Sequence, residues 1–303
     1  MRVLLTGASG YIGLHILDEL LRGGHEITAL VRSEAKLSAF MQEPRLKIVS
    51  VDLAQENRFA EALDGCQAVI HAALVWGEPG EEFELKDTIA AAKLFEAAGP
   101  AGIERCIFIS SVAVHRPFTG EMNEDQALAP IDIYGATKAA GELFLRAACA
   151  QHQMTGIVVR PGPVVGPPSV VGSPFRTERR INSMVAAARA GRPIEVEAGD
   201  GRQFSGLATV AKSVSLLTNL DNPDPTYICV DRSILTWEWI ARQVVACAGS
   251  SSEVHLLPAT GERPVPRFST SRIEKLLGRA TDTRSSLVAH INHLVKFSGE
   301  FAN

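Results

Sequence analysis

Residues 1–13, MRVLLTGASGYIG, contain the pattern that decides how this chain folds. A short apolar run at Val3–Leu5 stops at a glycine-rich turn, and residues 11–22 then carry apolar side chains at helical spacing, which predicts a strand, a tight loop and a helix. Gly7 permits the turn, Gly10 lets the backbone approach a pyrophosphate closely, and Gly13 lets the helix pack against the strand. Because the helix N-terminus offers free amides and the positive end of the helix dipole, the stretch predicts a dinucleotide site; a glycine turn without a ligand is the alternative.

Length and charge narrow the choices for the rest of the chain. With 303 residues, 46% of them hydrophobic, the chain can bury one large core, or one core with a smaller lobe attached. A formal net charge of -4 gives no basic footprint for nucleic acid. We therefore expect a small molecule, and no nucleic acid, as the partner.

The cysteines and the apolar runs predict a cytoplasmic protein. The five cysteines are odd in number, widely separated and free of any C-x-x-C pair, which argues against a disulfide framework or a zinc site. No signal peptide precedes the first strand, and no uninterrupted apolar run approaches the length of a membrane span. We expect free thiols in a reducing cytosol, no metal and no membrane association.

Further apolar runs follow the first helix, and helical segments such as 81–98 separate them. The additional predicted strands are 26–31, 46–51, 67–71, 105–109, 156–159 and 226–230. Strands that alternate with helices are typical of a parallel sheet covered by helices on both faces. The sequence therefore predicts an α/β fold with a doubly wound parallel sheet of about seven strands, in which ligands bind at the carboxyl ends of the strands.

The end of the second predicted strand indicates which dinucleotide binds. NAD sites usually place an acid there to accept from the ribose 2′-hydroxyl, whereas NADP sites place an arginine against the 2′-phosphate. This chain has Arg32-Ser33, with Lys36 one helical turn further on, and no carboxylate before Glu34. The pattern favours NADP as the cofactor, with NAD possible if Arg32 is only an exposed strand-end arginine.

Ser111, Tyr134 and Lys138 form the second informative pattern. Tyr134 and Lys138 are one helical turn apart and share a face. A phenol has a pKa of about 10, and a nearby ammonium lowers that pKa because it favours the phenolate. This pair is therefore suited to proton transfer near neutral pH. Ser111 follows the fifth strand and is suited to hydrogen-bond the substrate oxygen. A chance pairing of an exposed tyrosine and lysine is the alternative.

The order of glycine turn, serine and Tyr-x-x-x-Lys resembles the extended short-chain dehydrogenase/reductase family. The resemblance implies a Rossmann-type domain in residues 1–162, completed by the strand at 226–230, and a smaller C-terminal lobe, mainly residues 163–303, that binds substrate. It also implies that Asp52 and Leu53 flank the adenine and that the segment 160–167, RPGPVVGP, passes beside the nicotinamide. The predicted cofactor-binding residues are Gly7, Ser9, Gly10, Tyr11, Ile12, Gly13, Arg32, Asp52, Leu53, Ala72, Ala73, Tyr134, Lys138 and Pro161.

The substrate side departs from the family pattern. Where the family often continues its serine strand as S-x-x-V-Y-G, this chain has Val114-His115-Arg116-Pro117, and the family's V-x-D is absent at residues 206–209. Residues 198–204, AGDGRQF, match a glycine-turn-arginine element whose arginine often meets a substrate phosphate or carboxylate. The predicted substrate residues are Trp76, His115 and Arg202.

Three functions remain open from the sequence. The first is an NADP-dependent carbonyl reductase or alcohol dehydrogenase, similar to the dihydroflavonol-reductase-like branch. The second is an NAD-dependent sugar-nucleotide epimerase that uses the same serine, tyrosine and lysine without net redox change. The third, a non-catalytic NADP-binding sensor, is disfavoured because such relatives typically lose the tyrosine and lysine. A 4,6-dehydratase is also disfavoured, because that branch has Thr-Asp-Glu where this chain has Ser111-Val112-Ala113. The resemblance also implies a possible homodimer through the helices near 81–98 and 134–151.

Overall fold

Seven parallel strands form the central sheet, in the spatial order β12-β7-β5-β4-β1-β2-β3. The structure, a computed structural model, describes residues 1–53, 59–74, 83–170, 175, 177–259 and 265–297. The strands are β1 (Arg2–Thr6), β2 (Glu26–Val31), β3 (Leu46–Ser50), β4 (Ala68–His71), β5 (Arg105–Ile109), β7 (Thr155–Pro161) and β12 (Thr226–Cys229). The predicted doubly wound α/β fold is confirmed, and the strand order reverses between β1 and β4, where such sheets bind ligands.

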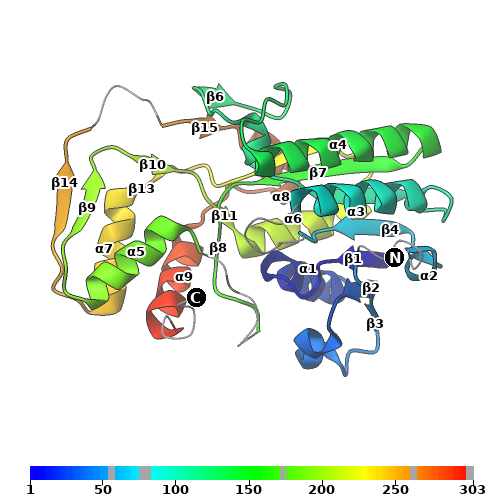
Figure 1. Cartoon of the computed structure of the whole chain (residues 1–303), viewed down its shortest axis with the longest axis horizontal. Coiled ribbons are helices and arrows are strands. Elements are labelled where there is room, and N and C mark those ends of the chain that lie inside the picture. Colours follow the sequence, from blue (N-terminus) through cyan, green and yellow to red (C-terminus); the bar gives the residue numbers. More distant parts are fainter. Residues whose placement is uncertain (54–58, 75–82, 171–174, 176, 260–264, 298–303) are drawn as a thin grey trace.

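Helices cover both faces of this sheet (Figure 1). One face carries α1 (Tyr11–Arg22), α6 (Leu207–Asn219) and α8 (Ser271–Leu277), and the other carries α2 (Phe59–Leu63), α3 (Phe83–Ala98) and α4 (Ile133–His152). Successive side chains of a strand point to opposite faces, so Val3 and Leu5 pack beneath α1 and α6 while Leu4 packs with α3. A strand that is buried on both faces consists of consecutive apolar residues, and for this reason the strands could be predicted from the sequence.

The C-terminal lobe is built around its own apolar core (Figure 1). Its helices are α5 (Arg179–Arg189), α7 (Trp237–Ala248) and α9 (Arg284–Phe297), and they pack beside the parallel pair β9 (Ile194–Glu197) and β14 (Val254–Leu257). Phe204 and Trp237, both fully buried, meet edge to face at the centre of this core.

The chain crosses between the sheet domain and the lobe several times after residue 162. Besides the predicted strand β12, both α6 and α8 belong to the core of the sheet domain, because α1 alone does not cover its face of the sheet. Short pairings hold the remaining segments together: β8 (Val164–Val165) with β11 (Ser205–Gly206), β10 (Gly201–Arg202) with β13 (Leu235–Thr236), and β6 (Glu121–Met122) with β15 (Arg267–Phe268). The sheet domain thus takes more from residues 163–303 than the one strand predicted.

All five cysteines are free thiols. In the described part of the chain, no helix combines the length and the apolar character needed to cross a bilayer.

Candidate active site

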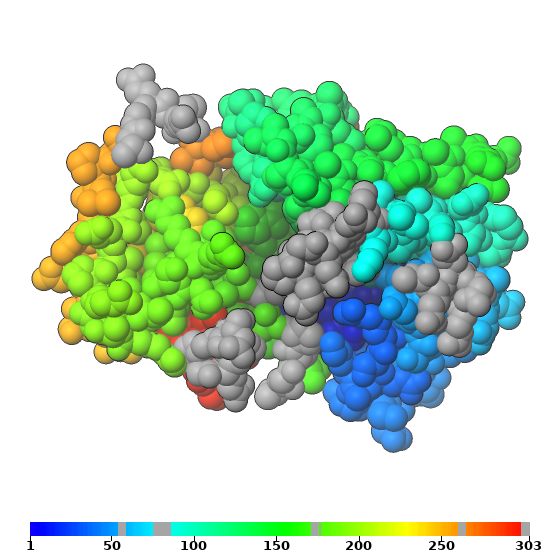
Figure 2. Space-filling view, in the orientation of Figure 1, coloured from blue at the N-terminus to red at the C-terminus, as the bar shows by residue number. Residues whose placement is uncertain are grey.

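A cleft of about 910 Å³ opens between the sheet domain and the lobe. Figure 2 shows the two parts that form its walls, the domain in blue to green and the lobe in yellow-green and orange. The cleft brings together most of the predicted residues: Gly7, Ser9, Gly10, Tyr11, Ile12, Gly13, Arg32, Asp52, Leu53, Ala72, Ala73, Ser111, Tyr134 and Arg202. Lys138 and Pro161 are not in its lining, although Gly162 and Pro163, directly after Pro161, are.

The glycine turn allows the backbone segments to approach one another. Gly7 has φ +71°, and a Cβ there would lie 2.6 Å from the amide nitrogen of Ala73, at the end of β4. A Cβ at Gly13 would lie 1.9 Å from the carbonyl oxygen of Gly7, so this glycine packs α1 against the turn itself. A Cβ at Gly10 would meet only that same oxygen, at 3.2 Å. Gly7 and Gly13 therefore leave no room for a side chain within the turn, and all three glycines line the cleft.

The start of α1 fits a pyrophosphate. The N-cap residue is Gly10, which provides no side-chain cap, and the first turn of the helix contains no acid. The amides of Tyr11 and Ile12 therefore have no side-chain acceptor from the cap, and both residues line the cleft. An anion placed there would meet these donors and the positive end of the helix dipole.

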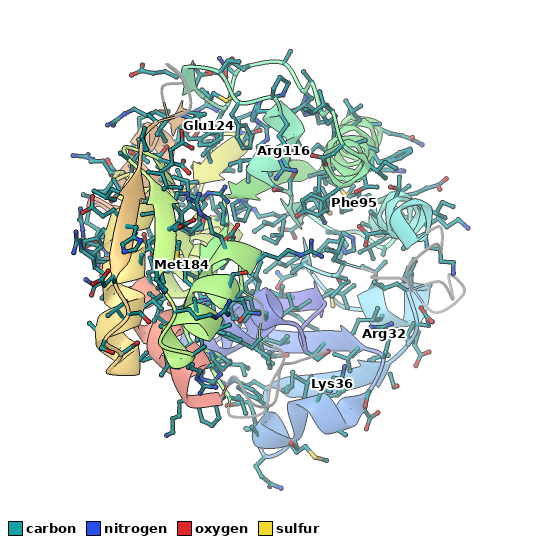
Figure 3. All side chains as sticks on the ribbon, turned by 60° about the vertical axis from the view of Figure 1, so that its left-hand side comes forward. Arg32, Lys36, Phe95, Arg116, Glu124 and Met184 are labelled. Atoms are coloured by element: carbon teal, nitrogen blue, oxygen red, sulfur yellow. The ribbon has the colours of Figure 1, made fainter. Side chains whose placement is uncertain are left out.

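The end of the cleft beside β2 and β3 is predominantly cationic. Arg32 follows β2, and Lys36 lies on the short 3₁₀ helix Glu34–Phe40; both are exposed and line the cleft. Figure 3 shows the two side chains on neighbouring parts of the blue ribbon. Asp52 and Leu53 follow β3 in the same lining. Two cations thus stand beside one carboxylate at this end.

Ser111 and Tyr134 reach one wall of the cleft from β5 and α4. The Ser111 hydroxyl accepts from the amide of Ala113 at 3.1 Å and so caps a 3₁₀ helix, Val112–His115. Gly135 lies at the start of α4, and a Cβ there would be 2.7 Å from the Ala113 carbonyl oxygen. A glycine at 135 therefore lets the N-terminus of α4 approach the segment that follows Ser111. Sequence reasoning missed this glycine, although its position on a helix, where glycine costs stability, was a signal.

Lys138 lies behind this wall, where only 3% of the residue is exposed. Its ammonium is 3.8 Å from the Asp87 carboxylate on α3 and 5.1 Å from the centre of the Phe108 ring. Burial lowers the pKa of Lys138, and the charge of Asp87 opposes that shift. The carboxylate thus favours the ammonium form. Asp87 was missed because nothing in its own helix marks it as a partner of a residue on α4.

His71, at the end of β4, has a structural environment. It is fully buried, its Nδ1 is 2.7 Å from the Thr6 hydroxyl, and its ring stacks on Phe108. Burial, with a smaller contribution from the charge of Lys138, lowers the pKa of His71 to about 3. The imidazole is therefore neutral at physiological pH.

The structure does not place His115 in the cleft. It is 2% exposed, and its Nε2 lies 2.9 Å from the buried guanidinium of Arg160, which also forms a two-bonded pair with Glu142. The side chain turns inward because this buried arginine needs an acceptor. His115 therefore belongs to the packing beneath the site. Trp76, also predicted to contact substrate, lies outside the described residues.

Two further arginines line the cleft, Arg202 from the lobe and Arg116 from the sheet domain. Arg202 has its guanidinium over the Trp237 ring at 5.2 Å and 3.8 Å from the Glu178 carboxylate. Arg116, which the sequence analysis noted only as a departure from the family pattern, also lines the cleft, and its Nη1 donates to Asp132 at 2.5 Å. The side chains in this part of the cleft thus come from several separate segments.

A family model confirms the resemblance on which the site was predicted. The model of the NAD dependent epimerase/dehydratase family matches residues 3–205, about two thirds of the chain. This chain belongs to that family. Membership confirms the expected relation to the extended short-chain dehydrogenase/reductases, and it makes the chain an enzyme of the NAD-dependent oxidoreductase and epimerase type.

Proteins that resemble this chain are named for different reactions. The dTDP-4-dehydro-6-deoxy-D-allose reductase of Streptomyces bikiniensis is 29% identical over 289 residues, 87% of this chain and 85% of the relative. The uncharacterized UDP-glucose epimerase YtcB of Bacillus subtilis is 24% identical over 234 residues, 72% of each protein. The UDP-glucuronic acid 4-epimerase from Bacillus cereus, solved in complex with NAD, shares the fold with a TM-score of 0.81 at 17% identity over 98% of this chain and 99% of its own. A reductase and an epimerase are both consistent with these relatives.

Proposed function

We propose that the protein is an NADP-dependent carbonyl reductase or alcohol dehydrogenase. The observation that carries this proposal is that Ser111 and Tyr134 line the same cleft as the glycine turn, with the paired ammonium of Lys138 buried behind them. A hydroxyl, a phenol and a cation next to a dinucleotide site are what proton transfer to or from a substrate oxygen requires.

In the direction of reduction, the chain's own residues manage the substrate oxygen. When bound, the reduced nicotinamide supplies the hydride that the carbonyl carbon accepts. The Ser111 hydroxyl donates a hydrogen bond to the carbonyl oxygen, and the Tyr134 hydroxyl gives that oxygen its proton, so the carbonyl becomes an alcohol. The Lys138 ammonium stabilises the phenolate that is left until solvent returns the proton.

The choice of NADP rests on the charges at the adenine end. Arg32 and Lys36 line the cleft there, and a guanidinium with a neighbouring ammonium suits a 2′-phosphate better than a ribose hydroxyl. Replacing Arg32 with Ala should therefore weaken NADPH binding about tenfold or more and leave NADH binding nearly unchanged. Equal losses for the two nucleotides would indicate NAD as the natural cofactor.

We also propose a homodimer through α3 and α4. These helices pack side by side, and their outer surface exposes the apolar side chains of Ile89, Leu143 and Phe144. A second copy of the same surface is the simplest cover for such a patch. Light scattering on the wild type and on Phe144→Glu checks the proposal, since the substitution should yield monomers.

An NAD-dependent epimerase is the second candidate. The observation that favours it is Arg202, a cleft-lining arginine in the lobe that would pair with the diphosphate of a nucleotide sugar. Tightly bound NAD in the purified protein would support this candidate.

The cytoplasmic location predicted from the scattered cysteines stays a prediction.

The nucleotide that copurifies, identified by mass, and NADPH oxidation over a panel of ketones and aldehydes test the leading proposal. Tyr134→Phe should lower kcat about 10²- to 10⁴-fold, because the proton donor is lost, while the Kd for NADPH stays within about twofold. No turnover across the panel, or equal turnover by Tyr134→Phe, would overturn the proposal.

A further inference from the structure

We propose that Arg116 binds an oxyanion of the substrate, so that the enzyme acts on carbonyl or alcohol compounds that carry a carboxylate or phosphate group. The inference rests on the proposed function, because it names the substrate class of the same site. Neither the family match nor the motif that includes Arg202 assigns a role to Arg116.

Arg116 lies on the substrate side of the cleft and close in sequence to the catalytic serine. It directly follows the 3₁₀ helix that Ser111 caps, and 43% of its side chain is exposed. In Figure 3, Arg116 lies well apart from Arg32 and Lys36, on the green part of the ribbon. An anion at Arg116 therefore belongs to the substrate and not to the adenine end of the cofactor.

The guanidinium of Arg116 is already oriented. One nitrogen, Nη1, donates to Asp132, and the guanidinium carbon lies 5.7 Å from the centre of the Phe118 ring. Within the described residues, this is the only hydrogen bond that the guanidinium makes, which leaves Nε and Nη2 without a protein acceptor. These two nitrogens form an edge that matches a carboxylate or phosphate with two parallel hydrogen bonds. An arginine held in this way loses less entropy when an anion binds.

The counter-ion of Arg116 lies outside the cleft. Asp132 is absent from the lining, and its other oxygen caps α4 by accepting from Gly135 at 2.7 Å. On the lobe side, by contrast, the partner of Arg202 is Glu178, which itself lines the cleft. Of these two lining arginines, Arg116 is therefore the one whose charge is not balanced within the cleft, and it makes that part of the cleft attractive to an anion.

The two arginines also repel each other across the same space. Burial lowers the pKa of Arg202, and the charges of Arg180 and Arg116 lower it further against the opposing effect of Glu178 and Asp200. An anion bound beside Arg116 would relieve this repulsion. Next to Arg116 the wall is apolar, because Phe118 and Phe268 meet edge to face and both line the cleft. The site thus suits a substrate with an apolar or planar part beside its charged group.

Three pairs of compounds that differ only in the charged group test the proposal. They are UDP-glucuronate with UDP-glucose, acetoacetate with methyl acetoacetate, and dihydroxyacetone phosphate with dihydroxyacetone. Binding to the NADPH-loaded full-length protein is measured by calorimetry for the wild type, Arg116→Gln, Arg116→Lys and the control Arg242→Gln, whose exposed ion pair with Glu238 lies on α7. The first two pairs report a carboxylate site and the third a phosphate site.

In at least one pair, we expect the wild type and Arg242→Gln to bind the member with the additional carboxylate or phosphate about tenfold or more tightly, and Arg116→Gln to lose that preference. Arg116→Lys should retain part of it, and the Kd for NADPH should not change. The proposal is overturned if no pair shows a preference. It is also overturned if Arg116→Gln weakens the binding of both members of a pair equally, because Arg116 would then serve only to support α4 through Asp132.

The same measurements on Tyr134→Phe separate this proposal from the proposed function. Charge preference in binding should persist in that variant even when turnover is lost. If the wild type keeps the binding preference but turns over none of the compounds, only the proposed function is overturned. If the wild type turns over both members of every pair with the same KM, only the role of Arg116 is overturned.

Discussion

The two walls of the cleft are built in different ways. The proposed cofactor wall is mainly backbone: a glycine at φ +71°, a helix N-terminus without a side-chain cap, and a strand end against which Gly7 has no room for a side chain. The proposed substrate wall is mainly side chains, with Arg116, Glu178 and Arg202 coming from three separate segments. A backbone wall depends on local sequence, whereas a side-chain wall depends on contacts between distant residues. The first is therefore common to a family, and the second is where its members can differ.

The largest expected effect is at the base of the site, where β5, β7 and α4 meet. Glu142 is fully buried and accepts from Arg160 at 2.9 and 2.7 Å and from Ser110 at 2.6 Å. Glu142→Ala leaves the Arg160 guanidinium buried without its counter-ion and should lower the free energy of unfolding by about 3–5 kcal/mol. Urea denaturation measures the loss.

The control for this prediction is Glu238→Ala, which breaks the exposed pair with Arg242 on α7. Such a pair contributes less than about 0.5 kcal/mol. If the two variants unfold at the same urea concentration, the buried pair contributes no more to stability than the exposed pair does.

Two glycine substitutions compare the walls directly. Gly13→Ala drives a Cβ to 1.9 Å from the Gly7 carbonyl oxygen, and Gly201→Ala drives one to 2.7 Å from the Leu235 carbonyl oxygen, next to Arg202. The first should raise the Kd for NADPH about 10- to 100-fold, roughly 1.4–2.7 kcal/mol, with little effect on substrate KM at saturating cofactor. The second should raise substrate KM and leave the cofactor Kd within about twofold. If Gly13→Ala raised substrate KM, or Gly201→Ala raised the cofactor Kd, the two walls would not act separately.

Asp87→Asn tests the charge behind the catalytic wall. Burial lowers the pKa of Lys138 and Asp87 opposes that shift, so removing the carboxylate lowers this pKa further. His71, which also faces Lys138, is neutral and cannot compensate. In the proposed mechanism catalysis needs the ammonium, so the alkaline limb of the kcat profile should move to lower pH, with about a tenfold loss of kcat on that limb and a smaller one near neutrality. Activity that declines equally at all pH values would point to a structural role only.

The same difference between the walls explains what the sequence could predict. The strand, turn and helix of residues 1–22 and the position of Tyr134 and Lys138 on one helix were predictable, because each rests on spacing along one short segment. The direction of the His115 side chain, into the protein interior and not into the cleft, was not predictable, because it depends on the buried Arg160. Asp87 and Arg116 were missed for the same reason: their roles come from Lys138 and Asp132, which lie on other elements.

The smallest expected effect concerns how firmly the substrate wall is anchored. Thr236 is the N-cap of α7, and its side chain accepts from the Trp239 amide at 3.2 Å. The next residue is Trp237, and the guanidinium groups of Arg180 and Arg202 lie over its ring. Thr236→Ala should therefore lower the free energy of unfolding by about 1 kcal/mol and raise substrate KM by no more than about threefold. Thr236→Ser, which keeps the cap, is the matched control. A loss of cofactor affinity in Thr236→Ala, with Thr236→Ser normal, would mean that the lobe also holds the glycine turn in place, and the separation of the two walls would then fail.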